Sequence, residues 1–185
     1  PYAVPLIPAY TEGLAASARG ITTQPPFAVR PMVEWEEVQT LVITWTSFPG
    51  ILKQIVRYAV DECEVMIVCD DQAAVLSTLQ NSSNGGPIAN LDNVTFLEAP
   101  YNSIWMRDYG PECIYKNEVD SLFLLDWIYN RPRPLDNALS DEIATAKNIG
   151  IYSTTAAPWD LVHTGGNFMA DGFGTAFSSN LVLDE

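Results

Sequence analysis

Short apolar runs and helical periods alternate through the first half of the chain. The run TLVITW (40–45) is rich in β-branched and aromatic residues and ends in Ser-Phe-Pro-Gly, which predicts a strand followed by a turn. From Pro49 onward, apolar positions repeat at helical spacing through GILKQIVRYAVDE. EVMIVCD (64–70) then predicts a buried strand, DQAAVLSTLQ an amphipathic helix and NVTFLEAP (93–100) a third strand. This order of strand, helix, strand, helix, strand predicts an α/β layer with some parallel pairing.

The second half of the chain changes to hairpin patterns. IYKNEVDSLFLLDW (114–127) predicts a β-hairpin with its turn at the tripeptide KNE. LSDEIATAKNIG (139–150) predicts a helix that has Ser140 or Asp141 as its N-cap and Gly150 as its stop. Strands followed by a helix therefore occur in both halves, which is a weak sign of an internal repeat.

The last segment, DLVHTGGNFMADGFGTAFSSNLVLDE (160–185), predicts another hairpin that turns at Ala170-Asp171-Gly172. The chain stops on the apolar sequence LVLDE, with no helix or polar tail after it. A repeat that ends on a strand leaves an exposed edge. We therefore expect an incomplete arrangement whose edge strand near 181–183 is unpaired or covered by another chain.

The N-terminal segment differs from the rest of the chain. Residues 1–30 carry five of the thirteen prolines and show no sustained period. The pattern predicts an extended, proline-rich arm over residues 1–32 and places the domain proper at 33–185.

Composition supports a folded domain and narrows its partners. With 185 residues, 48% of them hydrophobic and 17% charged, the chain can bury a real core. Its 23 acidic against 9 basic residues give a formal net charge of −14, which repels phosphate backbones and anionic lipid. Nucleic acid and membrane are therefore not expected as partners, and a cationic ligand is favoured. Solubility alone is the plainer explanation of the overall charge.

Targeting signals and metal motifs are not evident in the sequence. No apolar run approaches the roughly 20 residues of a membrane span, and the N-terminus lacks the pattern of a signal peptide. The start at Pro1 instead of Met leaves a processed, secreted precursor open. Cys63, Cys69 and Cys113 match neither a zinc site nor a disulfide framework, and buried structural thiols are the better interpretation for the first two. We expect no cofactor and no catalytic metal.

Two clusters place charged and aromatic side chains where a ligand could bind. IWMRDYGP (104–111) places Trp105, Arg107 and Asp108 just before a Gly-Pro stop. We expect Asp108 at the end of a strand or in a loop, where a carboxylate can bind a cation beside the Trp face. In DWIYNRPRPLDN (126–137), Arg131 and Arg133 flank a proline, so an extended backbone would point both forks the same way, toward an anion. Surface charges and a solvated loop are the structural alternatives.

HTGGN (163–167) is the third cluster. Its two glycines let the backbone approach another group closely. His163 is the only histidine of the chain, and without a neighbouring nucleophile it is better interpreted as a structural residue.

Together these motifs, in this order and spacing, resemble the N-terminal half of a bacterial-type peptidylarginine deiminase, a relative of the agmatine deiminases. The resemblance runs from about Val33 to Glu185. It implies an α/β fold, the pseudo-fivefold α/β propeller (pentein) of ββαβ modules, of which this chain would supply an incomplete arc. Agmatine deiminases also have a WxRDxGP segment, whereas the paired arginines of NRPRP favour the peptidylarginine branch.

The resemblance assigns roles to particular residues. Asp108 resembles the carboxylate that binds the guanidinium, and Trp105 resembles the aromatic wall beside the aliphatic stem. Arg131 and Arg133 resemble the pair that holds the carboxylate of a C-terminal arginine. Arg107, His163 and Asn167 are weaker candidates for the same site.

The chain also departs from the family pattern. The cysteine that attacks the guanidinium carbon and the later His-x-Asp pair are not in this sequence, and we expect neither Cys113 nor His163 to replace them. The resemblance implies hydrolysis of peptidyl arginine to citrulline and ammonia by a longer, secreted or cell-envelope enzyme. These 185 residues alone would be inactive, with the C-terminal part as a companion. An agmatine or small-guanidine deiminase, an amidino-transferring relative and a catalytically dead arginine-binding module remain the alternatives.

Overall fold

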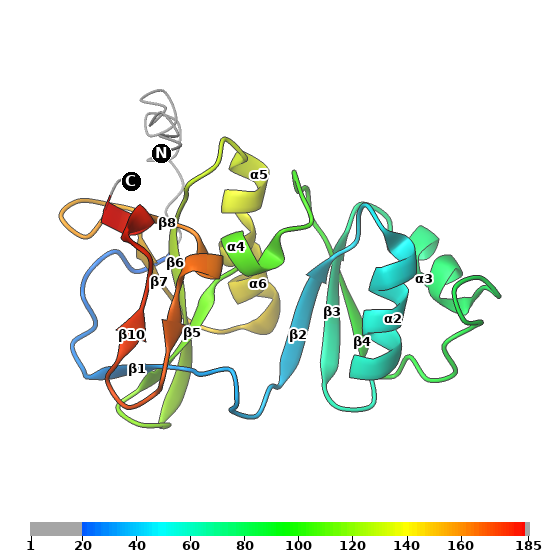
Figure 1. Cartoon of the computed structure of the whole chain (residues 1–185), viewed down its shortest axis with the longest axis horizontal. Coiled ribbons are helices and arrows are strands. Elements are labelled where there is room, and N and C mark those ends of the chain that lie inside the picture. Colours follow the sequence, from blue (N-terminus) through cyan, green and yellow to red (C-terminus); the bar gives the residue numbers. More distant parts are fainter. Residues whose placement is uncertain (1–19, 184–185) are drawn as a thin grey trace. The chain divides into compact units, whose positions relative to one another are not determined.

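The computed structural model describes residues 20–183, which fall into two compact units (Figure 1). The first unit is Pro1–Trp35 together with Arg107–Glu185, and the second is Glu36–Met106. Both units contain residues of the domain expected over 33–185, whose bounds stay a prediction. The chain leaves the first unit after Trp35 and returns to it at Arg107.

The second unit is a parallel sheet with helical crossovers, as the hydrophobic pattern predicted. Its elements in chain order are β2 (Thr40–Thr44), α2 (Pro49–Ala59), β3 (Glu64–Cys69), α3 (Gln72–Gln80) and β4 (Val94–Glu98). The strands lie in the order β2-β3-β4 and both pairs are parallel. All five elements and their parallel pairing are therefore confirmed.

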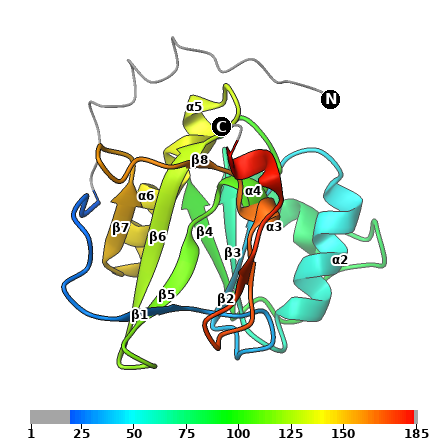
Figure 2. The same cartoon turned by 60° about the vertical axis from the view of Figure 1, so that its left-hand side comes forward.

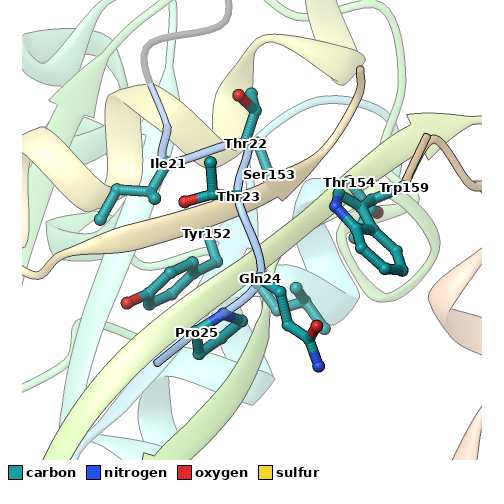
Figure 3. A pocket seen from close by; sticks show the side chains of 10 residues that line it. Ile21, Thr22, Thr23, Gln24, Pro25, Tyr152, Ser153, Thr154 and Trp159 are labelled. Atoms are coloured by element: carbon teal, nitrogen blue, oxygen red, sulfur yellow. The ribbon is translucent and has the colours of Figure 1, made fainter. Parts of the chain in front are cut away.

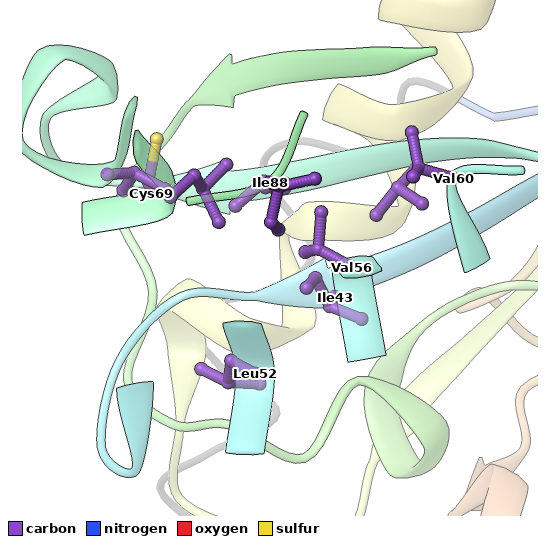
Figure 4. Close-up of a cluster of buried hydrophobic side chains, with 10 residues drawn as sticks. Ile43, Leu52, Val56, Val60, Cys69 and Ile88 are labelled. Atoms are coloured by element: carbon purple, nitrogen blue, oxygen red, sulfur yellow. The ribbon is translucent and has the colours of Figure 1, made fainter. Parts of the chain in front are cut away.

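The core of this unit lies between the sheet and its helices (Figure 4). Alternate side chains of β3 meet the apolar stripe of α2, and the fully buried members include Val56, Val65 and Ile67. Cys69 belongs to the same cluster, is 1% exposed and is a free thiol. Burial raises the pKa of Cys69 to about 11, so this cysteine is an inert core residue, as expected.

A buried lysine holds the loop that follows α3. Lys53 of α2 has no exposed surface, and its Nζ donates to Thr78 O at 2.8 Å, Asn81 O at 2.8 Å, Asn81 Oδ1 at 3.1 Å and Ser83 O at 3.0 Å. These oxygens lie at the C-terminal end of α3 and just beyond it, where helix carbonyls lack partners within the helix. Arg57 binds the same loop further along, at Gly86 O, 2.7 Å away. Two of the few cations of this acidic chain therefore have structural roles.

The first unit contains a mixed five-stranded sheet built around β6. The strands of this sheet are β1 (Val29–Pro31), β5 (Glu112–Lys116), β6 (Ser121–Tyr129), β7 (Ile151–Thr154) and β8 (Val162–His163). Their order is β1-β5-β6-β7, with β8 also on β6. The β5–β6 pair is the predicted hairpin, whereas β7 and β8 pair with β6 in parallel. Because β8 joins only at the end of β6, the HTGGN segment lies beside Tyr129.

One helix of this unit precedes β5, and two lie between β6 and β7 in the chain (Figure 2). They are α4 (Met106–Tyr109, whose first residue belongs to the second unit), α5 (Pro134–Asn137) and α6 (Leu139–Lys147), with α6 packed on β6. The predicted caps of α6 are wrong. Ala138 is its N-cap without a side-chain bond, and Asn148 ends it with φ 53°, a left-handed conformation that Asn tolerates. Ser140 instead is buried inside the helix, where its hydroxyl donates to Tyr109 O at 3.3 Å.

The C-terminal hairpin forms where expected. β9 (Met169–Ala170) and β10 (Ala176–Phe177) pair antiparallel, and Gly172 in the turn has φ 75°. The backbone N–H groups of Phe173 and Thr175 lower the pKa of Asp171 by donating to it. The edge strand expected near 181–183 is wrong, because Asn180–Leu183 is a single 3₁₀ turn, η3, stabilised locally through Ser179.

The arm predicted over residues 1–32 is partly a packed element. Residues 1–19 lie outside the described part of the chain. Val29–Pro31 forms β1 on the edge of the sheet, and Ile21 makes a parallel bridge with Tyr152. Proline at an edge position does not remove a ladder bond, which explains how a proline-rich segment can add a strand.

The α/β class is confirmed, while the propeller stays a prediction. The described strands form three separate sheets, none of which closes on itself among residues 20–183. Within that range no helix has both the length and the apolar character needed to cross a bilayer.

A buried carboxyl group in the sheet generates a stability prediction. Asp126 of β6 is 6% exposed, and burial raises its pKa to about 7, with Asp141 adding to the rise and the Ser140 hydroxyl opposing it. An unfolded chain releases this proton near the ordinary value of 3.8, so the folded state binds more protons between the two values. The free energy of unfolding should therefore fall as pH rises from about 4 to 7, by up to about 4 kcal/mol at roughly 1.4 kcal/mol per unit.

The variant Asp126→Asn should lose this pH dependence. Thermal melting of both proteins at pH 5 and pH 8 measures it, and the melting temperature of the wild type should drop more between the two. Parallel drops in the two proteins would show that Asp126 is not the source.

Candidate active site

Asp108 lies half-buried in the one-turn helix α4, not at a strand end or in a loop as expected. Its Oδ1 accepts a hydrogen bond from Thr164 Oγ1 at 2.9 Å. Thr164 directly follows β8, so the end of the sheet fixes the rotamer of the carboxylate. The remaining lone pairs of the carboxylate are available to a cationic ligand.

The two glycines after Thr164 permit this contact. A Cβ on Gly166 would lie 2.6 Å from Asp108 Oδ1, and a Cβ on Gly165 would lie 2.5 Å from Arg107 O and 3.0 Å from the Trp127 ring. A side chain at either position would force a neighbouring group to move, so the glycines let the backbone itself pack against α4. The close approach predicted for HTGGN is thus directed at the Asp108 segment.

Arg131 and Arg133 follow β6 in a tight turn, not in the extended backbone expected. The Arg133 N–H donates to Arg131 O at 2.7 Å, an i to i+2 bond typical of a γ-turn. The Arg131 fork bonds Asn130 O at 3.1 Å, and Arg133 Nη1 donates to the Tyr129 hydroxyl at 3.2 Å. Both arginine residues are half-buried, and a charge that is partly removed from water interacts more strongly with an anion.

The Tyr129 hydroxyl brings these charges into one electrostatic environment. Burial raises its pKa, Arg133 and Arg131 oppose the rise, and Asp108 adds to it. The geometry agrees with this environment. Arg133 bonds the Tyr129 hydroxyl, the Tyr129 ring contacts the ring of Tyr109 next to Asp108, and the pairing of His163 with Tyr129 places Thr164 where it bonds Asp108.

Arg107 pairs with Glu34 and not with its neighbour Asp108. It forms an ion pair with Glu34, and both side chains are exposed. Burial raises the pKa of nearby Glu112. The Arg107 charge opposes this rise and the Glu34 charge adds to it. These contacts favour a surface role for Arg107, which the sequence had kept as a weaker site candidate.

His163 and Asn167 lie next to the site as parts of its support. His163 is 5% exposed and packs edge-on against Trp127, with ring centroids 5.7 Å apart. Asn167 Oδ1 accepts the Ser179 N–H at 3.0 Å, which connects the glycine loop to the C-terminal turn. Such contacts agree with the structural interpretation of His163.

Trp105 and Cys113 are the remaining candidates. Trp105 belongs to the second unit and is 55% exposed, and its role as an aromatic wall stays a prediction. Burial and the Glu112 carboxylate raise the pKa of Cys113 to about 11. A thiol that holds its proton this firmly is a poor nucleophile, which supports the exclusion of Cys113.

Other possible sites in the described residues are weaker. Within residues 20–183 no group of three or more His, Cys, Asp or Glu side chains could hold a metal ion. A hollow of about 180 Å³ lies where segment 21–25 crosses β6 and β7, lined in part by Tyr152 and Trp159 (Figure 3). No predicted site residue lines it. The candidate active site is therefore the Asp108 and Tyr129 region.

Sequence reasoning missed Tyr129 and Thr164. Thr164 lies inside the HTGGN motif between His163 and the glycines, but no sequence pattern marks a threonine at a strand end as a functional residue. Tyr129 occupies the last position of an apolar strand, and its hydroxyl role depends on the turn after it. Both needed the parallel pairing of β8 with β6 to become evident.

Comparison with known proteins defines the family. The family model of the Porphyromonas-type peptidyl-arginine deiminase matches residues 30–184. The chain therefore belongs to this family, one of deiminases that act on guanidino groups. The family prediction from IWMRDYGP, NRPRP and HTGGN is confirmed.

Several relatives carry agmatine deiminase names. A "Putative agmatine deiminase" of Mycoplasma capricolum is 31% identical over 101 residues, which is 49% of this chain and 26% of that protein. Among solved structures, a Campylobacter jejuni agmatine deiminase variant with substrate bound has a TM-score of 0.67 at 20% identity, covering 83% of this chain and 46% of that one. The "Putative Arginine Deiminase from Porphyromonas gingivalis" has a TM-score of 0.69 at 16% identity, covering 83% and 47%.

The two structural matches show the fold. The chain spans about a quarter of the length of these sequence relatives and slightly under half of the solved chains.

The packing of the glycine loop predicts opposite effects for two neighbouring substitutions. In Gly166→Ala the new methyl meets the end of the Asp108 side chain, which can rotate away, so ligand binding should weaken at least tenfold with little loss of stability. In Gly165→Ala the methyl meets backbone, so stability should fall by about 1–3 kcal/mol. Thermal melts and ligand titrations of both variants measure the contrast. Equal losses of stability in Gly166→Ala and Gly165→Ala would show that the Asp108 side chain does not rotate away from the new methyl.

Proposed function

We propose that the intact protein hydrolyses the guanidino group of peptidyl arginine, preferably at a peptide C-terminus, to give citrulline and ammonia. The observation that carries this proposal is that Tyr129 bonds Arg133 through its hydroxyl and contacts Tyr109, the neighbour of Asp108, through its ring. A C-terminal arginine has a cation at one end and a carboxylate at the other. One carboxylate and two guanidinium forks provide the complementary charges.

Asp108 would bind and orient the substrate guanidinium. The guanidinium stays protonated at every working pH, so it needs a fixed negative partner when it leaves water. Thr164 holds one oxygen of Asp108 by its hydroxyl, which leaves the other free to face two N–H groups of the substrate. The same bond keeps the carboxylate from turning toward solvent.

The reaction itself needs a nucleophile that we place outside these 185 residues. Attack of a thiolate on the guanidinium carbon forms a C–S bond and a tetrahedral centre, and proton transfer to nitrogen releases ammonia. Water then cleaves the C–S bond, which yields the ureido group and restores the thiolate. Cys113 does not supply this thiolate, because burial holds its proton. The nucleophile would come from a C-terminal part of the same protein, attached or as a companion chain.

A second candidate is deimination of agmatine. The names of the sequence relatives and of the substrate-bound neighbour favour it. Agmatine has no carboxylate, so it would leave Arg131 and Arg133 without a substrate partner. A module that binds arginine without turnover is the alternative outside enzymes, and release of ammonia by the intact protein separates the two. The protein or peptide substrate and a location outside the cytoplasm remain predictions.

Replacing Asp108 tests the cation site. Asp108→Asn in the intact protein should keep the fold and lower kcat/KM by on the order of a hundredfold or more, because one charge-assisted partner is lost. Ammonia release on a peptide ending in arginine measures the effect, with exposed Asp160→Asn as the matched control. Turnover close to that of the control would remove Asp108 from the site.

Replacing both arginines tests substrate choice. Arg131→Ala with Arg133→Ala should weaken turnover of a peptide with C-terminal arginine by about 10²–10⁴, taking roughly 1.5–3 kcal/mol per lost charged hydrogen bond and partial non-additivity. Turnover of internal arginine should fall far less. The control is Arg30→Ala, which removes a guanidinium bonded to Glu118 O. Equal losses on both substrates would contradict carboxylate recognition and favour the agmatine or binding alternatives.

A further inference from the structure

Tyr129 is a buried tyrosine whose ring contacts Tyr109 and whose hydroxyl bonds Arg133. Its side chain is 4% exposed, and its ring meets the ring of Tyr109 edge-on with centroids 5.8 Å apart. Tyr109 is 1% exposed and directly follows Asp108 in α4. The ring of Tyr129 is therefore held by the same helix that carries the cation-binding carboxylate.

The hydroxyl of Tyr129 connects this rigid part to the turn that carries the arginines. It accepts Arg133 Nη1 at 3.2 Å, and Arg133 is only four residues further along the chain. The Tyr129 N–H donates to Asn137 Oδ1 at 2.6 Å, which anchors the strand end to α5. The flexible Arg133 side chain thus bonds to a tyrosine that is itself buried and held by Tyr109 and Asn137.

We propose that Tyr129 is a positioning residue that sets the distance between the Arg133 guanidinium and the Asp108 carboxylate, and so selects a substrate whose charged ends are one arginine apart. The inference rests on the proposed function, since it assumes that both charged groups contact one substrate. It goes beyond that function by assigning the spacing to a residue that need not contact the substrate.

The physical basis is the loss of side-chain freedom. An arginine has several rotatable bonds, and holding it in one rotamer when substrate binds costs affinity. The bond to the Tyr129 hydroxyl already restricts the Arg133 side chain before the substrate binds, so less conformational entropy is lost on binding. Because Tyr109 and Asp108 are consecutive residues of α4, the contact between the two tyrosine rings also fixes where that rotamer lies relative to Asp108.

The experiment compares Tyr129→Phe with wild type in the intact protein. The variant keeps the ring and its contact with Tyr109 and removes only the hydroxyl. Three substrates are used: a peptide with C-terminal arginine, the same peptide as its C-terminal arginine amide, and the peptide with C-terminal homoarginine, which is one methylene longer. Tyr152→Phe is the matched control, since Tyr152 lies in the same sheet and packs against Phe27 and Phe123.

We expect the KM for the arginine peptide to rise about five- to tenfold in Tyr129→Phe, with kcat within about twofold. Turnover of the amide should change less than twofold, because it lacks the group that Arg133 would bind. The preference of the wild type for arginine over homoarginine should shrink by a similar factor of about five. Tyr152→Phe should leave all three substrates unchanged.

The other outcomes overturn the proposal in distinguishable ways. Equal losses on acid and amide, or a fall in kcat alone, would show that Tyr129 only supports the fold. No change on any substrate would show that other contacts position Arg133. A wild type that treats acid and amide alike, or turns over agmatine alone, would refute the proposed function itself, and with it the inference.

Discussion

The contact between the Asp108 carboxylate and the loop after β8 is the constraint on which the site depends. A carboxylate, a threonine hydroxyl and two glycines meet so closely that a Cβ on either glycine would force a neighbouring group to move. That contact exists because β8 pairs with the last two residues of β6 and delivers Thr164 beside α4. The end of one strand therefore determines the position of both Thr164 and Tyr129, and through them the charges that would meet a substrate.

The distribution of the few basic residues follows from the acidity of the chain. Among nine cations against 23 acids, several have a clear structural task. Lys53 and Arg57 satisfy carbonyls after α3, and Arg107 pairs with Glu34 at the surface. Arg131 bonds the Asn130 carbonyl and Arg133 bonds the Tyr129 phenol. Two guanidinium groups thus follow β6 within three residues of one another in a protein of net charge −14.

Local chemistry explains where sequence-based expectations about backbone shape were wrong. Arg131-Pro-Arg133 was expected to be extended because of its proline, yet the chain turns at this point through the Arg133 N–H. Helix α6 was expected to stop at Gly150, but Asn148 adopts the left-handed conformation two residues earlier. Residues 181–183 were expected to form an edge strand, whereas local bonds close Asn180–Leu183 into a 3₁₀ turn.

The sequence by itself determined the elements and the chemistry. Periodicity predicted β2 to β4 with α2 and α3, the β5–β6 hairpin and the body of α6, because those patterns depend on neighbouring residues alone. The motifs around Asp108, the two arginines and the glycine pair carried the family, which the match over residues 30–184 then showed. Only the tertiary structure decided which of these residues meet. The parallel pairing of β8 with β6 joins segments more than thirty residues apart, and the roles of Tyr129 and Thr164 follow from that pairing, which no local pattern encodes.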